Sequence, residues 1–141
     1  MKDYPWGKGT VNWLRDATAN DSDKSFTVPA GKIWDVKKIH IQLVTTATVG
    51  NRMLAVNIAA DGTNYLYMFG ATAQAASLTR YYLLGCVTVS DDFTTATFTT
   101  AQDIGPTILP AGAVIRVYDS AAIDVAADDL IVVLHYVEYD A

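Results

Sequence analysis

Residues 28–36 read VPAGKIWDV, and residues 109–117 read LPAGAVIRV. In each stretch we expect proline to fix φ at the second position of a turn, and the glycine that follows permits positive φ. Such a turn leads a short strand sharply into a long one. Two equivalent corners predict two Greek-key halves, which is the arrangement of a jelly roll. The structural turn residues are therefore Pro29, Gly31, Pro110 and Gly112.

The composition indicates one all-β domain. A chain of 141 residues, 51% hydrophobic and 18% charged, suits a single ordered core. β-Branched Val, Ile and Thr are abundant, and such side chains fit a pleated sheet well. Every acidic residue except Glu138 is Asp, which favours turns and caps over helix surfaces.

Short apolar or alternating runs from residue 25 onward are separated by Gly, Pro, Asp and Asn, a pattern typical of a sandwich or barrel. The pattern predicts a single jelly-roll β-sandwich of about eight antiparallel strands at residues 25–141, preceded by an irregular N-terminal arm at residues 1–24. The strands are expected near residues 25–28, 32–46, 51–60, 64–69, 79–89, 93–99, 113–119 and 129–139.

Two of these strands carry additional information. In the strand at 32–46, Trp34 and Val36 have the opposite parity to Ile39, Ile41 and Leu43. A β-bulge near Lys37 and Lys38 would place both sets in the core. The run LIVVL at 130–134 is apolar on both faces, so we expect it to be a central strand or to be covered by another subunit.

The arm at 1–24 mixes aromatic residues with glycines and a polar run, and it shows neither strand nor helix periodicity. It either folds back over its own sandwich or reaches onto a neighbouring subunit. Exposed Trp and Tyr are common interface anchors, so Tyr4, Trp6 and Trp13 are the candidate partner contacts. We expect a chain without residues 1–24 to keep the folded sandwich.

The net charge and the targeting signals limit the classes of partner and the compartment that we expect. The net charge of −5 disfavours nucleic-acid binding through phosphate contacts. No run of about 18 apolar residues exists, so we expect no membrane span. The lone Cys86 cannot form an intramolecular disulfide, and the N-terminus lacks the apolar stretch of a secretory signal; synthesis in a reducing cytoplasm is therefore expected.

Residue patterns for catalysis or metal binding are weak. His40 and His135 lie in separate strands, and neither a Gly-x-Ser-x-Gly sequence nor a phosphate-binding loop is present. The stretch Asp119–Asp129 contains four aspartates that could gather around Ca²⁺, but it lacks the spacing of a standard calcium loop. Turn and cap roles are the favoured interpretation, with calcium left open. The expectation is a non-enzyme without cofactor or metal.

Three segments, at residues 26–34, 47–52 and 109–129, resemble small jelly-roll virion proteins of tailed bacteriophages that decorate and cement a capsid. The resemblance covers roughly residues 25–139 and lies in turns and strand starts. It implies a structural subunit on the outer surface of the head, made in the host cytoplasm, that clamps neighbouring capsomers of the major capsid protein. It also implies a symmetric homo-oligomer, with a trimer favoured and a dimer possible.

Other functions remain open on the sequence alone. The chain could be a head-fibre, neck or tail component of the same virion. It could also be a carbohydrate-binding module that stacks aromatic side chains on sugar rings. The aromatic residues available for that purpose are Trp6, Trp13, Trp34, Tyr65, Tyr67, Tyr81 and Tyr82. An enzyme of unknown chemistry is the remaining alternative.

Overall fold

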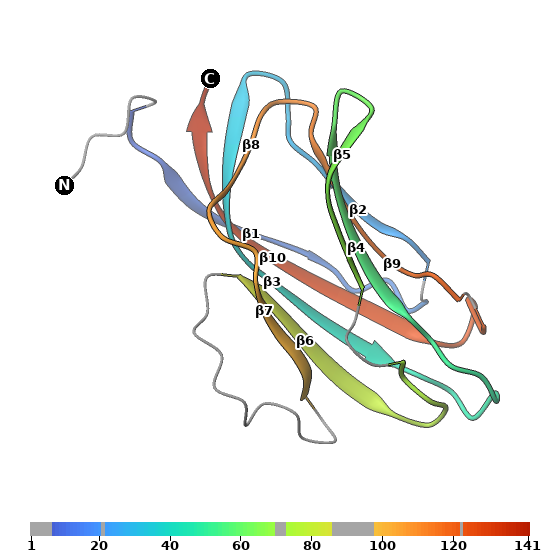
Figure 1. Ribbon diagram of the computed structural model, residues 1–141. Coiled ribbons are helices and arrows are strands. Elements are labelled where there is room, and N and C mark those ends of the chain that lie inside the picture. The colour runs from blue at the N-terminus through green and yellow to red at the C-terminus, as the bar shows by residue number, and fades with distance from the viewer. Residues whose placement is uncertain (1–6, 21, 70–72, 86–97, 122) are drawn as a thin grey trace.

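The computed structural model describes residues 7–20, 22–69, 73–85, 98–121 and 123–141, and these form ten strands without a helix. Figure 1 shows the strands arranged in two layers. Their bounds are β1 (Thr10–Asp16), β2 (Lys24–Thr27), β3 (Lys32–Val44), β4 (Leu54–Ala60), β5 (Thr63–Phe69), β6 (Thr79–Gly85), β7 (Phe98–Asp103), β8 (Thr107–Leu109), β9 (Val114–Asp119) and β10 (Asp129–Asp140).

The strand order confirms the predicted jelly roll. One sheet has the order β1-β10-β3-β6-β7, with β8 also pairing with β3, and the other has the order β2-β9-β4-β5. The chain crosses between the two sheets several times, and its last strand returns beside its first. All pairings are antiparallel except that of β6 with β7. The fold is therefore two four-stranded jelly-roll sheets, with β7 and β8 extending the first.

The core lies between the two sheets. In β4, Leu54, Val56 and Ile58 are buried. In β3, both Trp34 and Ile39 are buried although their parities differ. The pairing of β3 with β10 shifts register between Val36 and Lys38, so Lys37 is the extra residue of a bulge. The predicted bulge is confirmed, and it lets one long strand present both apolar sets to the core.

The predicted central position of the LIVVL run is also confirmed. Residues 130–134 belong to β10, which pairs with β1 on one side and β3 on the other. Leu130, Val132 and Leu134 point into the core and are buried, whereas Ile131 and Val133 lie half-buried on the outer face.

Each of the two corners is a four-residue turn that begins at its proline. The Lys32 N–H donates to the Pro29 carbonyl at 3.2 Å, and the Ala113 N–H donates to the Pro110 carbonyl at 3.1 Å. The expectation that proline occupies the second position is therefore wrong, because the closing bonds place it first and the glycine third. This is the position at which a type II turn requires positive φ.

The glycines have that conformation, and the two corners are bonded to each other. φ is +72° at Gly31 and +82° at Gly112. The Val28 N–H donates to the Ala113 carbonyl, and the Gly112 N–H donates to the Val28 carbonyl, both at 2.9 Å. The two copies of the sequence repeat therefore form a pair of turns that are hydrogen-bonded to each other at one end of the sandwich.

The structure differs from the sequence expectation near the N-terminus. We expected residues 1–24 to be irregular, but Thr10–Asp16 form β1, which pairs along its whole length with β10. Lys24, the first residue of β2, is buried, and its ammonium donates to the Thr18 carbonyl at 3.0 Å and to Asn20 Oδ1 at 2.9 Å. The expected strand at 93–99 falls mostly outside the described residues.

Candidate interaction surface

The strand β1 carries three large apolar side chains that are exposed to solvent. Within the described part of the chain β1 pairs only with β10, so its other side is an unpaired sheet edge. Val11 and Trp13 are 60% and 63% exposed, and Leu14 is also exposed. We call Val11, Trp13 and Leu14 the β1 edge. An unpaired edge with large apolar side chains is a ready contact site for another chain.

Trp13 is fixed in place by the neighbouring strand. It lies opposite His135 in the register, and the two rings stack with centroids 3.9 Å apart and planes 10° apart. One face of the indole is therefore covered while the other faces outward. A rigid aromatic side chain of this kind loses little conformational entropy on binding.

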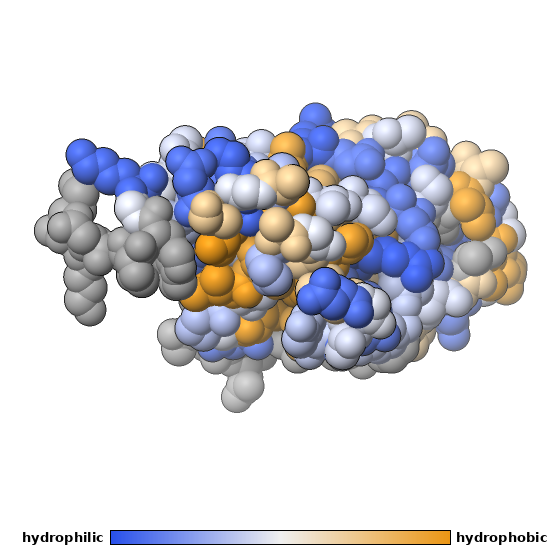
Figure 2. Space-filling view, turned by 90° about the horizontal axis from the view of Figure 1, so that it is seen from above, coloured by the Kyte–Doolittle hydropathy of each residue, from blue (hydrophilic) through white to orange (hydrophobic). Residues whose placement is uncertain are grey.

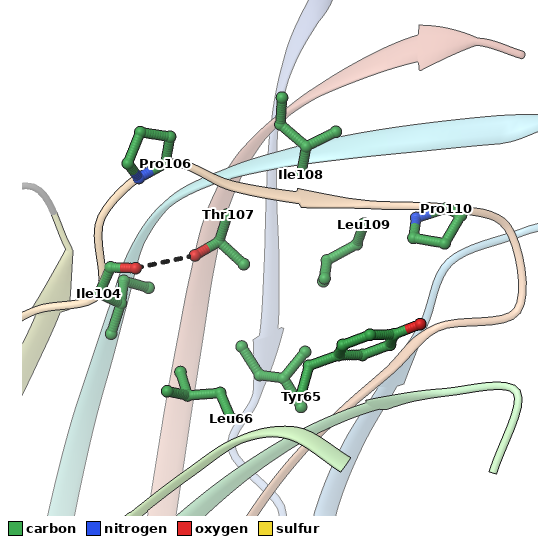
Figure 3. Close-up of a pocket in the computed structure, with 9 residues that line it drawn as sticks. Tyr65, Leu66, Ile104, Pro106, Thr107, Ile108, Leu109 and Pro110 are labelled. Atoms are coloured by element: carbon green, nitrogen blue, oxygen red, sulfur yellow. Dashed lines mark hydrogen bonds between the residues drawn. The ribbon is translucent and has the colours of Figure 1, made fainter. Parts of the chain in front are cut away.

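The structure also contains a pocket of about 440 Å³ at the opposite side of the first sheet from β1. Tyr65 and Leu66 of β5 form one wall, and Leu109 of β8 with Pro106 and Pro110 forms the other. Figure 3 shows Thr107 and Leu109 projecting from β8 towards Tyr65 and Leu66. The remaining lining residues are Ile58, Ile104 and Ile108.

The pocket is apolar and carries no charge. The Thr107 hydroxyl is already used, donating to the Ile104 carbonyl at 3.2 Å. Figure 2 looks down on the end of the sandwich where the corners lie, and it shows apolar side chains gathered among polar ones there. A volume of this size is within the range of ligand-binding pockets.

A polar and aromatic row crosses the outer face of the second sheet. Arg116 of β9 lies between Ser25 of β2 and Asn57 of β4, and Asn57 lies opposite Tyr67 of β5. The guanidinium carbon of Arg116 lies 4.1 Å from the ring centroid of Tyr118. This row therefore presents aromatic rings, an amide and a guanidinium side by side.

Hydrogen bonds hold the side chains of this row in position. Arg116 Nε donates to Asp23 Oδ2 at 2.6 Å. The hydroxyls of Tyr67 and Tyr118 are hydrogen-bonded to each other, which raises the pKa of Tyr118 above its ordinary value. Asn57 donates an amide N–H to Asn64 Oδ1 at 3.1 Å.

The aspartates of the 119–129 stretch surround an arginine. Arg52 and Asp128 are both fully buried, and Arg52 Nε donates to Asp128 Oδ2 at 2.6 Å while Nη2 donates to Oδ1 at 3.1 Å. Arg52 Nη1 also donates to the carbonyls of Thr48 and Gly50. The carboxylate beside it raises the pKa of Arg52 above its usual value.

Other aspartates of the stretch hold neighbouring loops. Asp124 accepts hydrogen bonds from the hydroxyls of Thr46 at 2.7 Å and Thr48 at 2.8 Å, which lower the pKa of its carboxyl. Asp119 Oδ1 accepts from the backbone N–H of Met53 at 2.8 Å. These bonds are the turn and loop roles that the sequence favoured over a calcium site.

The two histidines lie close to each other in the strand register. His40 pairs with Val133 and His135 with Lys38, which makes the two imidazoles diagonal neighbours on the outer face of the first sheet. Among the residues that the structure describes, no group of three or more His, Cys, Asp or Glu side chains is placed to hold a metal ion. His40 instead lies 5.8 Å, centroid to centroid, from Tyr81.

The structure places some of the candidate residues named from the sequence in two separate regions, and the others lie outside the described residues. Trp13 lies on the β1 edge, and the turn residues form the joined corners. Tyr4 and Trp6 lie outside the described residues. Sequence reasoning missed both the pocket and the Arg52–Asp128 pair. Arg52 itself lay in one of the segments that carry the family resemblance, yet no signal linked it to Asp128.

No family model matches the chain, and no curated protein matches it. Among solved structures, that of infectious bursal disease virus, Gx strain, is similar at 13% identity and a TM-score of 0.28. The match covers 95% of this chain and 42% of that one, so this chain spans about two fifths of the length of its neighbour.

Membrane association through a helix has no support in the described ranges. None of the residues there forms a helix with the length and hydropathy needed to cross a bilayer.

Proposed function

We propose that this chain is a virion structural protein that attaches to the outside of a tailed-phage head and holds neighbouring capsomers of the major capsid protein together. The sequence resemblance in the turns and strand starts supports this proposal, and so does the jelly-roll topology. In this role the protein works by adhesion between folded surfaces. It needs no cofactor and catalyses no reaction.

The observation that carries the proposal is the β1 edge. Val11 and Trp13 remain mostly exposed on a strand with an unpaired side, whereas comparable side chains of β10 and β3 are covered. Burying two such side chains against a partner would stabilise the contact by about 1.5–3 kcal/mol each. A capsomer surface that pairs with this strand would use both its backbone groups and its apolar side chains.

Attachment through several copies accounts for durable binding. An oligomer that touches several capsomers at once gains effective concentration, so modest contacts combine into stable attachment. A protein that binds only the assembled lattice also shifts the equilibrium away from disassembly.

Binding to heads lacking the protein tests the proposal. Heads of the virus that encodes the chain, produced without it, are mixed with purified protein and sedimented. Val11→Asp places a charge on the β1 edge and should weaken binding by about tenfold or more, because an unpaired charge would be desolvated. Val49→Asp is the matched control, since Val49 is 91% exposed in a loop away from β1. It should bind as the parent does.

Two results would refute the proposal. The parent could fail to sediment with heads, or the two variants could bind equally well while both melt like the parent. Imaging of labelled protein on whole virions distinguishes the outer surface of the head from a head-fibre, neck or tail position.

A carbohydrate-binding role is the second candidate, supported by the row on the second sheet. Tyr67 is 48% exposed, and Asn57 and Asn64 carry amide groups that can both donate and accept. An aromatic ring beside such groups can stack on a sugar ring and bond its hydroxyls. A glycan array with the parent and with Tyr67→Ala tests this role: binding that Tyr67→Ala abolishes supports it, and no binding above background refutes it.

A further inference from the structure

The pocket between β5 and β8 has the properties of a receptor for an extended, uncharged chain segment. All nine lining residues are uncharged, and Tyr65 at its rim is 65% exposed. A large exposed aromatic beside an apolar pocket is characteristic of sites that bind a partner side chain. A charged ligand would lose its hydration there without gaining a counter-charge.

Two unpaired strand edges flank the pocket. Within the described residues, β5 pairs only with β4 and β8 pairs only with β3. Backbone N–H and C=O groups on such edges can bond an added strand, while a pocket beside them accepts one of its side chains. The geometry therefore suits a short extended peptide that inserts one large side chain.

The chain itself contains a segment of this chemistry. Residues 4–6 read Tyr-Pro-Trp, uncharged and rich in aromatic surface. The residue before a proline is restricted to extended conformations, so this segment is biased towards the shape that a strand edge accepts. Tryptophan is also the side chain most enriched among residues that dominate binding energy.

The position of the pocket relative to β1 bears on whether residues 4–6 of the same chain or of a second copy bind in it. Thr10 lies opposite Glu138, Glu138 opposite Trp34, and Trp34 opposite Leu109 in one row across the first sheet. The β1 strand is thus three strand spacings, about 14 Å, from the pocket wall at Leu109.

The chain just before β1 stays on the β1 side of the sheet. A Cβ at Gly9 would collide with the side chains of Val137 and Tyr139, so the backbone there lies directly against β10. Two strands, β10 and β3, lie between this end of the chain and the β8 wall of the pocket, whereas a second copy can approach the pocket from outside.

We infer that Trp6 of one copy binds in the β5–β8 pocket of the next, with residues 4–6 lying along the unpaired strand edge. The donor segment and the receptor pocket are different surfaces of the chain, so the contact is head-to-tail. Such contacts close into a ring when the rotation that relates one copy to the next permits it. The inference deepens the proposed function, since it names the contact that would build the oligomer that attaches to the head.

Four chains test the inference by molar mass in solution, measured by sedimentation or light scattering. They are the parent, Trp6→Ala, Tyr65→Arg and Val49→Arg. Tyr65→Arg places a charge at the pocket rim, and Val49→Arg places the same charge in an exposed loop outside the pocket lining. Both residues are exposed, so folding should survive each change.

The parent and Val49→Arg should form the same oligomer. Trp6→Ala and Tyr65→Arg should each raise the dissociation constant by about 30-fold or more. Mixing these two variants gives the sharper test, because one supplies an intact pocket and the other an intact Trp6. The mixture should form a one-to-one dimer, since no second complementary pair remains.

The inference is overturned if the parent is monomeric, if Trp6→Ala leaves the oligomer unchanged, or if the mixture contains only monomers. Circular dichroism of each variant at high dilution verifies that the sandwich is intact. Because the assay contains no heads, it separates this inference from the proposed function: an oligomer that fails to bind heads would refute only the latter.

Discussion

The buried pair of Arg52 and Asp128 allows a quantitative prediction. Replacing Arg52 by Met leaves the Asp128 carboxylate fully buried without its cation, and it removes the donors to the Thr48 and Gly50 carbonyls. Removing one partner of a buried ion pair costs about 3–5 kcal/mol. For a domain of this size each kcal/mol lowers Tm by about 3 °C. We therefore expect Arg52→Met to lower Tm by about 10–15 °C.

Calorimetry and urea denaturation measure this loss, and the chain provides a matched control. Arg116 pairs with Asp23 on the surface, where both side chains are about half exposed, so Arg116→Met should cost about 0–1 kcal/mol. The double variant Arg52→Met/Asp128→Leu should be more stable than Arg52→Met alone, because no unpaired charge remains. A loss in Arg52→Met no larger than that in Arg116→Met would refute the reasoning.

Four other substitutions test the corners and the loop at residues 119–129. Gly31→Val and Gly112→Val should each lower the free energy of unfolding by about 1–3 kcal/mol, because φ is positive at both glycines. Gly31→Asn should lower it less. Equal urea midpoints for all of these variants would disprove the turn assignment. The Thr46 and Thr48 hydroxyls lower the pKa of the Asp124 carboxyl. The ionised carboxylate therefore stabilises the folded state at pH values above the ordinary carboxyl pKa, and this stabilisation is lost as the pH falls through the lowered pKa. Asp124→Asn should therefore flatten the decline in urea midpoint at acid pH, and an unchanged slope would contradict this.

The parts of the fold that follow from repeating local patterns could be predicted. The change of parity in β3 located the bulge at Lys37, and the run that is apolar on both faces indicated the central position of β10. The repeated corner indicated a jelly roll because glycine readily adopts the positive φ that such a turn requires. Each of these signals depends on residues close together in the chain.

β1 could not be recognised because it buries no regular face. Its residues are exposed or half-buried throughout, so alternation of apolar and polar side chains is not required. Its strand character comes from pairing with β10, at the other end of the chain. Backbone hydrogen bonds of this kind do not select particular side chains and therefore leave little trace in the sequence.

The candidate sites were only partly predictable for a related reason. Trp13 was identified because an aromatic residue in a segment without periodicity is conspicuous. The pocket depends on how the three-residue strand β8 packs opposite β5, and the Arg52–Asp128 pair joins loops that are distant in sequence. Such contacts between distant segments are set by the whole fold.

The position of β10 also constrains how the protein folds. β10 comes last of the ten strands but pairs with β1, the first, and with β3, so the first sheet cannot close before residues 129–140 leave the ribosome. Until then the β3 strand, which contains Ile39, Ile41 and Leu43, lacks its pairing partner β10. Contacts between such distant residues slow folding, so the nascent chain passes through an aggregation-prone stage in which chaperones would have their target.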